Sequence, residues 1–512
     1  MAEEFIERRI ITGLIVSDRF ATEIEPVLTI QDLASVTARR IAGWCLEYTK
    51  KYHKAPNKDI EGIFEEQKAL GLPKDQEEYI GGILSGLSEE YERDQFNSDY
   101  LLDQTKAYLQ KRRLLALSES IKHATEGKDL EEAEEAISGY LSHKVTDSES
   151  KTVDPFSSPD LIRKAFTYSS EPIVVFPKAL GKFWNSQMTR DSLISLVGPE
   201  KRGKTFMLME IAMTAMASGC NVAFFQAGDM TEAQQLRRMG IYLTRRSDKE
   251  KYCEERYMPV VDCWLNQTDD CHQSCRECSC GLFPQNTKQE DVTYEDLVKA
   301  IELNKGYKAC RNCEFMYVAE KGAVALEKVP AVKVLTWKDA EKKMAKWQSR
   351  SKGRFKLSTY PNDTLTVGEI WSLLDGWERS EGFVCDVVVV DYADILAPES
   401  GMSKQDFRQQ TNKTWQKLRR LSQEKHCLVV TATQAASTSY TKTTITLKDF
   451  SEDKRKYSHV TAMYSLNQTP QEKKLGIMRL GEMVVRDDEF SANHQVKILQ
   501  CLQRGRPVVG SF

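Results

Sequence analysis

The feature that most constrains the fold is a glycine-bounded loop between two apolar segments. Residues 192–206 read SLISLVGPEKRGKTF, in which Gly198 and Gly203 enclose four residues and Lys204 and Thr205 follow. This is the G-x4-G-K-[ST] pattern, in which successive backbone N–H groups surround phosphate oxygens. The run LISLV before the loop predicts a buried strand, and FMLMEIAMTAMA after it predicts a helix whose N-terminal end attracts anions. The sequence therefore predicts a phosphate-binding loop, with a chance glycine-rich turn as the alternative.

The loop as a whole is expected to hold the phosphates of a nucleotide. Lys204 would reach the β- and γ-phosphates, and the Thr205 hydroxyl would bind Mg²⁺. The expected nucleotide-binding residues are Gly198, Pro199, Glu200, Lys201, Arg202, Gly203, Lys204, Thr205 and Phe206.

Three polar residues follow other buried runs and are the expected partners of the loop. Asp391 ends CDVVVVD, so it would face the ligand edge of a sheet and hold the magnesium through water. Asp229 follows NVAFFQ and would orient an attacking water, or would cap the helix TEAQQLRRM, or both. Gln434 follows CLVVTAT and would sense the γ-phosphate, with a turn glutamine as the alternative.

The alternation of strand-like and helical segments predicts the fold class. From about residue 173, short β-branched runs alternate with helical stretches, which favours an α/β fold with a parallel sheet covered by helices. Residues 1–145 carry apolar residues at helical spacing and predict a helical N-terminal domain. Residues 146–172 are rich in Ser, Pro and charge, which predicts a linker with a short helix. The motor-like domain would then span 173–512. Its expected strands are LISLV, NVAFFQ, FKLSTY, CDVVVVD, CLVVTAT, VVR and VKILQC.

The ends and apolar runs of the chain predict a cytoplasmic protein. The N-terminal MAEEFIERRI lacks the layout of a signal peptide, and no apolar stretch is long enough to span a membrane. In that compartment, the 13 cysteines predict metal binding or plain burial rather than disulfides. The net charge of -3 neither predicts nor excludes a nucleic-acid partner, because a local basic groove is sufficient.

A cysteine-rich insert from about 253 to 320 interrupts the α/β pattern. Its pairs Cys275-x2-Cys278 and Cys310-x2-Cys313 each offer two thiolates to one tetrahedral Zn²⁺. We expect a small domain that folds around a structural zinc, and buried unligated cysteines are the alternative. Further cysteines leave open which four bind and whether a second ion is present: Cys263, Cys271 and Cys280.

In this order, the motifs resemble those of the C-terminal motor domain of DnaB-type replicative helicases, phage-encoded versions above all. The family's Glu-Met pair is similar to Asp229-Met230, its Asp-Tyr pair to Asp391-Tyr392, and its Ser-Gln pair to Thr433-Gln434. The layout of helical domain, linker helix and motor is similar as well. The resemblance is strongest over 173–251 and 355–440. It implies a RecA-like P-loop ATPase motor, with Asp229 one methylene shorter than the family's glutamate.

The resemblance also implies an activity and partners. The protein would be a homohexameric ring that uses ATP and Mg²⁺ to move 5′–3′ along single-stranded DNA and unwind forked duplex DNA, with primase and a helicase loader as partners, in the host cytoplasm if phage-encoded. A neighbouring subunit would supply a basic finger from a Lys-x-Arg pattern. Here GEMVVRDDEF supplies Arg486, and Val484 stands in the lysine position. The substitutes for that lysine are Lys473, Lys474 and Arg479. A RecA-like ATPase that assembles on DNA without unwinding it is the alternative function.

Candidate DNA contacts lie in two loops and one basic segment. The loop 397–410 carries Lys404 and Arg408, and the loop 436–448 carries Tyr440 and Lys442. The segment 333–356 is dense in Lys and Arg and contains two tryptophans, so it would bind a strand near the ring mouth or form a solvated amphipathic helix. Those tryptophans are Trp337 and Trp347.

Overall fold

The structure is a computed structural model of the chain and describes most of its residues. They form two compact units, 1–152 and 153–512, which are treated separately below. Within the described residues, no helix combines the length and the apolar character needed to cross a lipid bilayer. The described residues are 2–73, 76–78, 80–85, 97–127, 133, 136–137, 140, 162–163, 166, 171–228, 230–276, 278–311, 313–318, 320–399, 407–436, 439, 442–449, 454–486, 491 and 493–512.

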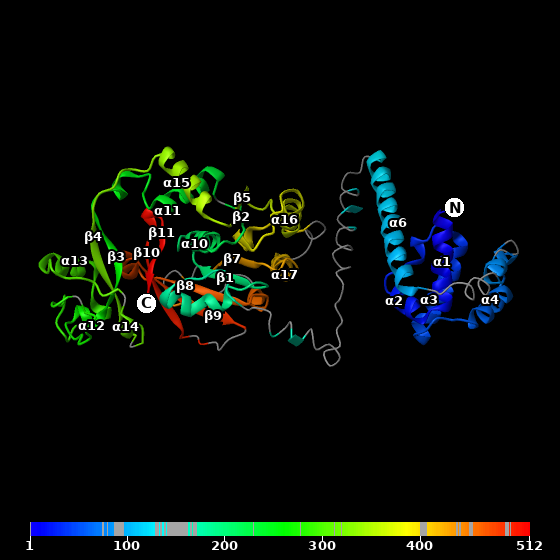
Figure 1. Cartoon of the computed structure of the whole chain (residues 1–512), viewed down its shortest axis with the longest axis horizontal. Helices are drawn as coiled ribbons and strands as arrows, with labels where there is room; N and C mark the ends of the chain where they lie inside the picture. Colours follow the sequence, from blue (N-terminus) through cyan, green and yellow to red (C-terminus); the bar gives the residue numbers. More distant parts are fainter. Residues whose placement is uncertain are drawn as a thin grey trace. The chain divides into compact units, whose positions relative to one another are not determined.

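The N-terminal unit is built from helices around one apolar core (Figure 1). α3 begins after Ser35, whose hydroxyl accepts a hydrogen bond from the Ala38 amide, and its buried residues recur at helical spacing. The buried Glu7 carboxylate accepts hydrogen bonds from the Ser35 amide at 3.1 Å and the Tyr108 hydroxyl at 2.5 Å, so it links three helices. The helices are α1 (Ala2–Val16), α2 (Asp18–Ile24), α3 (Val36–Tyr52), α4 (Asp59–Ala69) and α6 (Ser98–Glu126).

The second unit is organised by a nine-stranded sheet with the order β11-β10-β9-β8-β1-β7-β6-β2-β5. The six strands from β8 to β5 run parallel, and β9, β10 and β11 continue the sheet antiparallel. The first of the parallel strands in the chain, β1, therefore lies between β8 and β7. The strands are β1 (Leu193–Gly198), β2 (Val222–Ala227), β5 (Phe355–Tyr360), β6 (Val387–Asp391), β7 (Leu428–Gln434), β8 (Ala462–Asn467), β9 (Ile477–Val485), β10 (Gln495–Cys501) and β11 (Arg506–Ser511).

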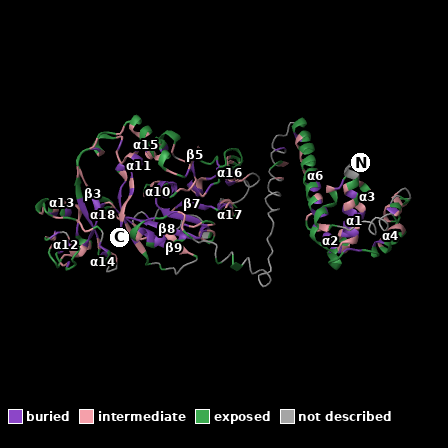
Figure 2. Cartoon of the chain, in the orientation of Figure 1, coloured by how far each residue is buried: buried purple, intermediate pink, exposed green. Residues whose placement is uncertain are grey.

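Helices cover both faces of this sheet, which makes the unit an α/β fold as the alternation in the sequence predicts (Figures 1 and 2). Successive side chains of a strand point to opposite faces, so Val387 and Val389 join one core while Val388 and Val390 join the other. Burial on both faces explains why the parallel strands are continuous apolar runs. The helices of one face are α9 (Lys178–Trp184) and α10 (Lys204–Ala217), and those of the other are α16 (Val367–Glu381) and α17 (Phe407–Glu424).

The cysteine-rich insert is framed by a separate two-stranded antiparallel sheet. Its core continues onto β9 and β10 through Ile477 and Leu499, so the insert packs on the antiparallel part of the main sheet. Two helices flank it in the chain and pack on each other: α11 (Glu232–Thr244) and α15 (Trp337–Arg350). The structure extends the insert beyond residue 320, to the end of β4 at Val329. It contains β3 (Arg256–Cys263), α12 (Trp264–Gln267), α13 (Tyr294–Leu303), α14 (Glu314–Val318) and β4 (Gly322–Val329).

Candidate active site

The site lies at the edge of the sheet where the parallel strands end. Gly198, the last residue of β1, pairs with Gln434, the last residue of β7. Asp391, the last residue of β6, pairs with Gln226 of β2. Because the carboxyl ends of parallel strands share one edge, the loop after β1 meets the polar residues that follow its neighbours.

The loop after β1 has the backbone geometry of an anion-binding turn. Gly203 has φ 89°, a left-handed conformation that favours glycine, and α10 begins at the next residue. No side chain of the described residues caps this helix end, so the first amide groups of α10 point at the loop with their partial positive charge. A Cβ added at Gly198 would lie 3.3 Å from the Leu466 side chain, so a larger residue where the loop leaves the strand would make Leu466 shift.

Lys204 is folded back onto the loop. It is 8% exposed, and its Nζ donates hydrogen bonds to the carbonyl oxygens of Gly198 at 2.7 Å and Pro199 at 3.0 Å. Burial lowers the pKa of Lys204 to about 8, against the opposing effect of nearby carboxylates led by Asp391. Within the described part of the chain, the hydrogen bonds of this desolvated ammonium go to two loop carbonyls, which favours the arrival of an anion.

Asp391 has the environment of a metal-binding carboxylate. It is 2% exposed, and its Oδ1 accepts a hydrogen bond from the Thr205 hydroxyl at 3.2 Å. Burial raises the pKa of Asp391, and the Thr205 hydrogen bond opposes this. Its Oδ2 is buried with no hydrogen-bond partner among the described residues. A hydroxyl beside an unpartnered carboxylate oxygen suits Mg²⁺, which prefers oxygen ligands and retains waters.

Gln434 joins the loop to a buried ion pair. Its Nε2 donates to Oε1 of Glu200 at 3.1 Å, and its amide donates to Oδ2 of Asp394 at 3.2 Å. The Asp394 carboxylate also accepts from the Thr433 hydroxyl at 2.5 Å and from Nζ of Lys456 at 2.8 Å. Lys456 is 1% exposed, so this pair fixes the end of β7 to the segment that precedes β8.

Sequence reasoning missed three of the charged residues at this site. Asp394 stands three residues after Asp391, which is a signal that could have been used. Lys456 lies in a short basic stretch, and Arg238 lies next to Arg237 in α11, so neither has a local signal. The Arg238 guanidinium stands 4.4 Å from the ring centre of Phe206, and burial lowers its pKa while Asp391 opposes that effect.

The structure brings Lys204, Thr205, Asp391 and Gln434 together, but not Arg486. Arg486 follows β9, which is antiparallel to β8, and its amide donates to the Thr461 carbonyl just before β8 at 3.0 Å. It therefore lies at the edge where β1 begins, opposite the loop. Among the other expected residues, Arg479 is ion-paired with Glu472 at 2.6 Å. Lys474 is ion-paired with Glu295 and Lys442 with Asp449. Arg408 is exposed, but it lies in the first turn of α17 and not in a loop as expected. Asp229, Lys404, Tyr440 and most of the linker helix lie outside the described residues.

The four cysteines expected to bind one zinc do not come together as two knuckles. The sulfur of Cys275 lies 3.7 Å from that of Cys313, whereas the sulfur of Cys278 lies 3.2 Å from that of Cys280. In the part of the chain that the structure describes, no three metal-binding side chains are grouped closely enough to hold an ion. The turn around Cys310 is instead held by its amide, which donates to the buried carboxylate of Asp262 at 2.8 Å. A zinc ion in the insert stays a prediction.

Burial of the Lys204 ammonium predicts a pH-dependent stability. Below pH 8 both the folded and the unfolded chain carry this proton, so the folded state bears the full cost of burying the charge. Between pH 8 and 10.5 the unfolded chain binds more of the proton, so the free energy of unfolding rises with pH. Lys204→Met should therefore be more stable than the parent below pH 8 by about 3 kcal/mol, with the gap closing by pH 10.5.

Urea unfolding of the nucleotide-free chain at several pH values measures this difference. Lys182→Met is the matched control, because Lys182 is exposed in α9 and its replacement removes a lysine without removing a buried charge. A constant difference between Lys204→Met and the parent from pH 7 to 10.5 would contradict the expectation.

The fold of the chain is similar to solved structures, although its sequence matches no family model. No protein-family model matches the chain, and no curated protein matches it in sequence. A solved DnaB-like replicative helicase, described together with its interactions with primase, superposes with a TM-score of 0.55 at 12% identity, covering 98% of each chain. A second solved structure, described as an ATPase domain, superposes with a TM-score of 0.43 at 11% identity, covering 70% of this chain and 98% of that one.

Proposed function

Because the chain has the fold of a DnaB-like replicative helicase, we propose that it is an ATP-driven motor that moves along single-stranded DNA and unwinds duplex DNA. The observation that carries the proposal is the meeting of Lys204, Thr205 and Asp391 at one edge of the sheet. A buried ammonium, a hydroxyl and an unpartnered carboxylate oxygen match the terminal phosphates of ATP and their magnesium.

Each residue of the site has a task in ATP hydrolysis. Lys204 leaves the loop carbonyls for the β- and γ-phosphates and stabilises the charge that develops as the bond to the γ-phosphate breaks. Thr205 and Asp391 would hold Mg²⁺, which supplies charge neutralisation between the phosphates. Asp229 is the proposed residue that orients water. Gln434, now held by Glu200, is placed to exchange that contact for the γ-phosphate.

Assembly into a ring is part of the proposal. Arg486 lies at the opposite edge from the loop of its own chain, which suits a finger that completes the site of a neighbouring subunit. By analogy of fold alone, we propose a homohexamer that moves 5′–3′ along DNA. The segments 397–410 and 436–448 would hold the DNA. Primase is a proposed partner because that relative is described with it, and a helicase loader and a cytoplasmic location complete the proposal.

Strand displacement tests the proposal. The chain with ATP and Mg²⁺ should release a labelled strand from a fork with two single-stranded tails, and Lys204→Met should not. Forks that keep only the 5′ tail or only the 3′ tail measure the direction of movement. Assemblies that hydrolyse ATP on DNA yet leave the fork intact would contradict unwinding and favour the alternative, an ATP-dependent assembly switch.

A further inference from the structure

Helix α15, which precedes the edge strand β5, carries a row of cations that the proposed function does not use. Lys338, Lys342, Lys346 and Arg350 recur at every fourth position, so they follow one ridge of the helix in steps of about 6 Å. All four are exposed, as is Lys343 beside them. Among the described residues, none of these five side chains forms a salt bridge. We call these five residues the α15 cation row.

The helix that carries this row is firmly anchored. The Arg246 guanidinium donates to the carbonyl of Lys333 at 2.7 Å and to the Asp339 carboxylate at 2.9 Å, which fixes the first turn of α15. Trp347 packs against the core on the inner side, and Gly240 of α11 allows the close approach of Ala340. The α15 helix contains two carboxylates, and the Asp339 contact with Arg246 leaves Glu341 as the other. These contacts hold the helix in place, and the face that carries the α15 cation row is positively charged.

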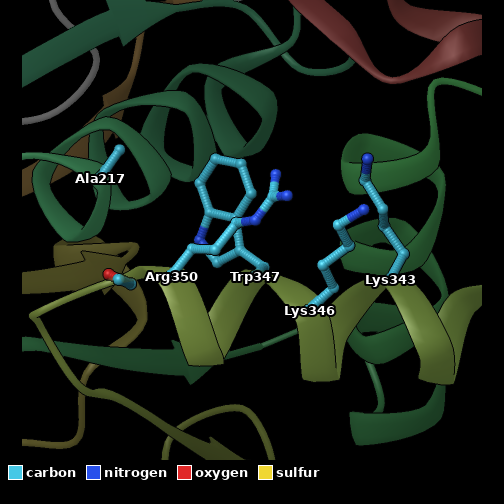
Figure 3. A pocket seen from close by; sticks show the side chains of 6 residues that line it. Ala217, Lys343, Lys346, Trp347 and Arg350 are labelled. Carbon is cyan, nitrogen blue, oxygen red and sulfur yellow. The ribbon is translucent and has the colours of Figure 1, made fainter.

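A pocket opens between the C-terminal part of the α15 cation row and the C-terminal end of α10. It has a volume of about 210 Å³ and is lined by Lys343, Lys346, Trp347 and Arg350, with Ala217 at the end of α10. Figure 3 shows the Lys343 and Lys346 side chains extending from α15 on the side that carries Trp347. The Ser351 hydroxyl donates to the Met216 carbonyl at 2.7 Å and ties the two helix ends together. Three cations around one small pocket suit a phosphate group.

An aromatic ring stands at the other end of the row. Trp337 is 71% exposed, and Nζ of Lys338 lies 5.5 Å from its ring centre. An exposed flat ring next to cations is the combination that holds single strands, in which unpaired bases stack while phosphates meet positive charge. A protein partner would need a larger apolar core than this one ring.

We propose that the α15 cation row and Trp337 bind the backbone and a base of single-stranded DNA. This is a second strand-binding surface, next to the C-terminal end of α10 and formed by residues other than those of the segments 397–410 and 436–448. This proposal goes beyond the proposed function, because binding of DNA to α15 does not depend on which reaction the nucleotide site performs.

Binding of a labelled oligothymidylate over a range of salt concentrations tests this surface. The triple variant Lys342→Gln, Lys346→Gln, Arg350→Gln should reduce the magnitude of the slope of log affinity against log salt by about 2, roughly 0.7 for each lost phosphate contact. Trp337→Ala should weaken binding roughly 10-fold and leave that slope unchanged. ATP hydrolysis without DNA should be unaffected in both variants, because these residues lie outside the nucleotide site.

The matched control removes the same charge elsewhere on the surface. Lys299→Gln, Lys305→Gln, Lys308→Gln changes three lysines of the insert and should keep the parent slope. Equal slopes in the α15 variant and this control would overturn the proposal. Equal affinity for a duplex of the same length would overturn the preference for single strands, and displacement of the DNA by polyglutamate at matched charge would indicate an acidic protein instead. A chain that binds through α15 yet fails to unwind forks refutes only the proposed function.

Discussion

Replacing Lys204 with methionine is expected to lower the turnover number of ATP hydrolysis by about 100- to 1,000-fold, the usual effect of losing one fixed donor to a developing negative charge. The reason is the position of Nζ within the loop, where it contacts two carbonyls that a phosphate would displace. Methionine is unbranched and apolar, one heavy atom shorter than lysine, and suits the buried surroundings, so the fold should remain.

Steady-state phosphate release with and without DNA measures this effect, and Lys182→Met in α9 is the control. The variant should also keep the higher stability below pH 8 that removal of a buried ammonium predicts. Loss of both hydrolysis and stability would indicate misfolding, whereas turnover near that of the parent would contradict the placement of Lys204 against the phosphates.

Replacing Arg486 with alanine should lower the turnover number by about 1,000-fold or more, as the loss of an arginine finger does. Arg486 lies at the edge where β1 begins, so it cannot serve the loop of its own chain, which follows the end of β1. The defect should appear only in assemblies, because a single chain already lacks the finger.

Mixing two inactive chains tests whether the finger acts between subunits. Assemblies of Arg486→Ala with Lys204→Met should regain part of the activity, because the intact loop of the first can face the intact Arg486 of the second. No recovery in confirmed mixed assemblies would contradict a finger supplied by a neighbour. Lys473→Ala and Lys474→Ala test two of the substitutes for the missing lysine, and a loss equal to that of Arg486→Ala would assign the lysine's part of the finger to that residue.

Much of the sheet was predictable because parallel strands are buried on both faces. Runs such as LISLV and CDVVVVD coincide with β1 and β6. The strand β8, with the sequence AMYSLN, and β11, with RPVVGS, were not predicted, since polar residues and a proline interrupt their apolar character. The order of the strands could not be predicted from the sequence either, because strands that pair with each other are far apart in the chain.

The positions of four site residues could be predicted because each lies at the end of a strand or at the start of the helix that follows the loop after β1, where topology fixes its position. Lys204, Thr205, Asp391 and Gln434 are of this kind. Lys456 is different: it reaches Asp394 from a segment 62 residues away, and nothing local distinguishes it from a solvated lysine. The spacing of the cysteines predicts two knuckles that share one zinc. Long-range packing places Cys275 beside Cys313, one cysteine from each knuckle, but it places Cys278 beside Cys280.

The opposite placement of the loop and Arg486 has an arithmetic consequence for assembly. If each chain offers a loop on one flank and a finger on the other, every joint is head-to-tail, a heterologous contact that repeats until it closes or runs on. In a linear assembly, the chain at one end has a loop that no neighbouring Arg486 reaches, and the chain at the other end has an Arg486 that reaches no loop. The last chain that closes the ring supplies both missing contacts, so it completes two catalytic centres at once.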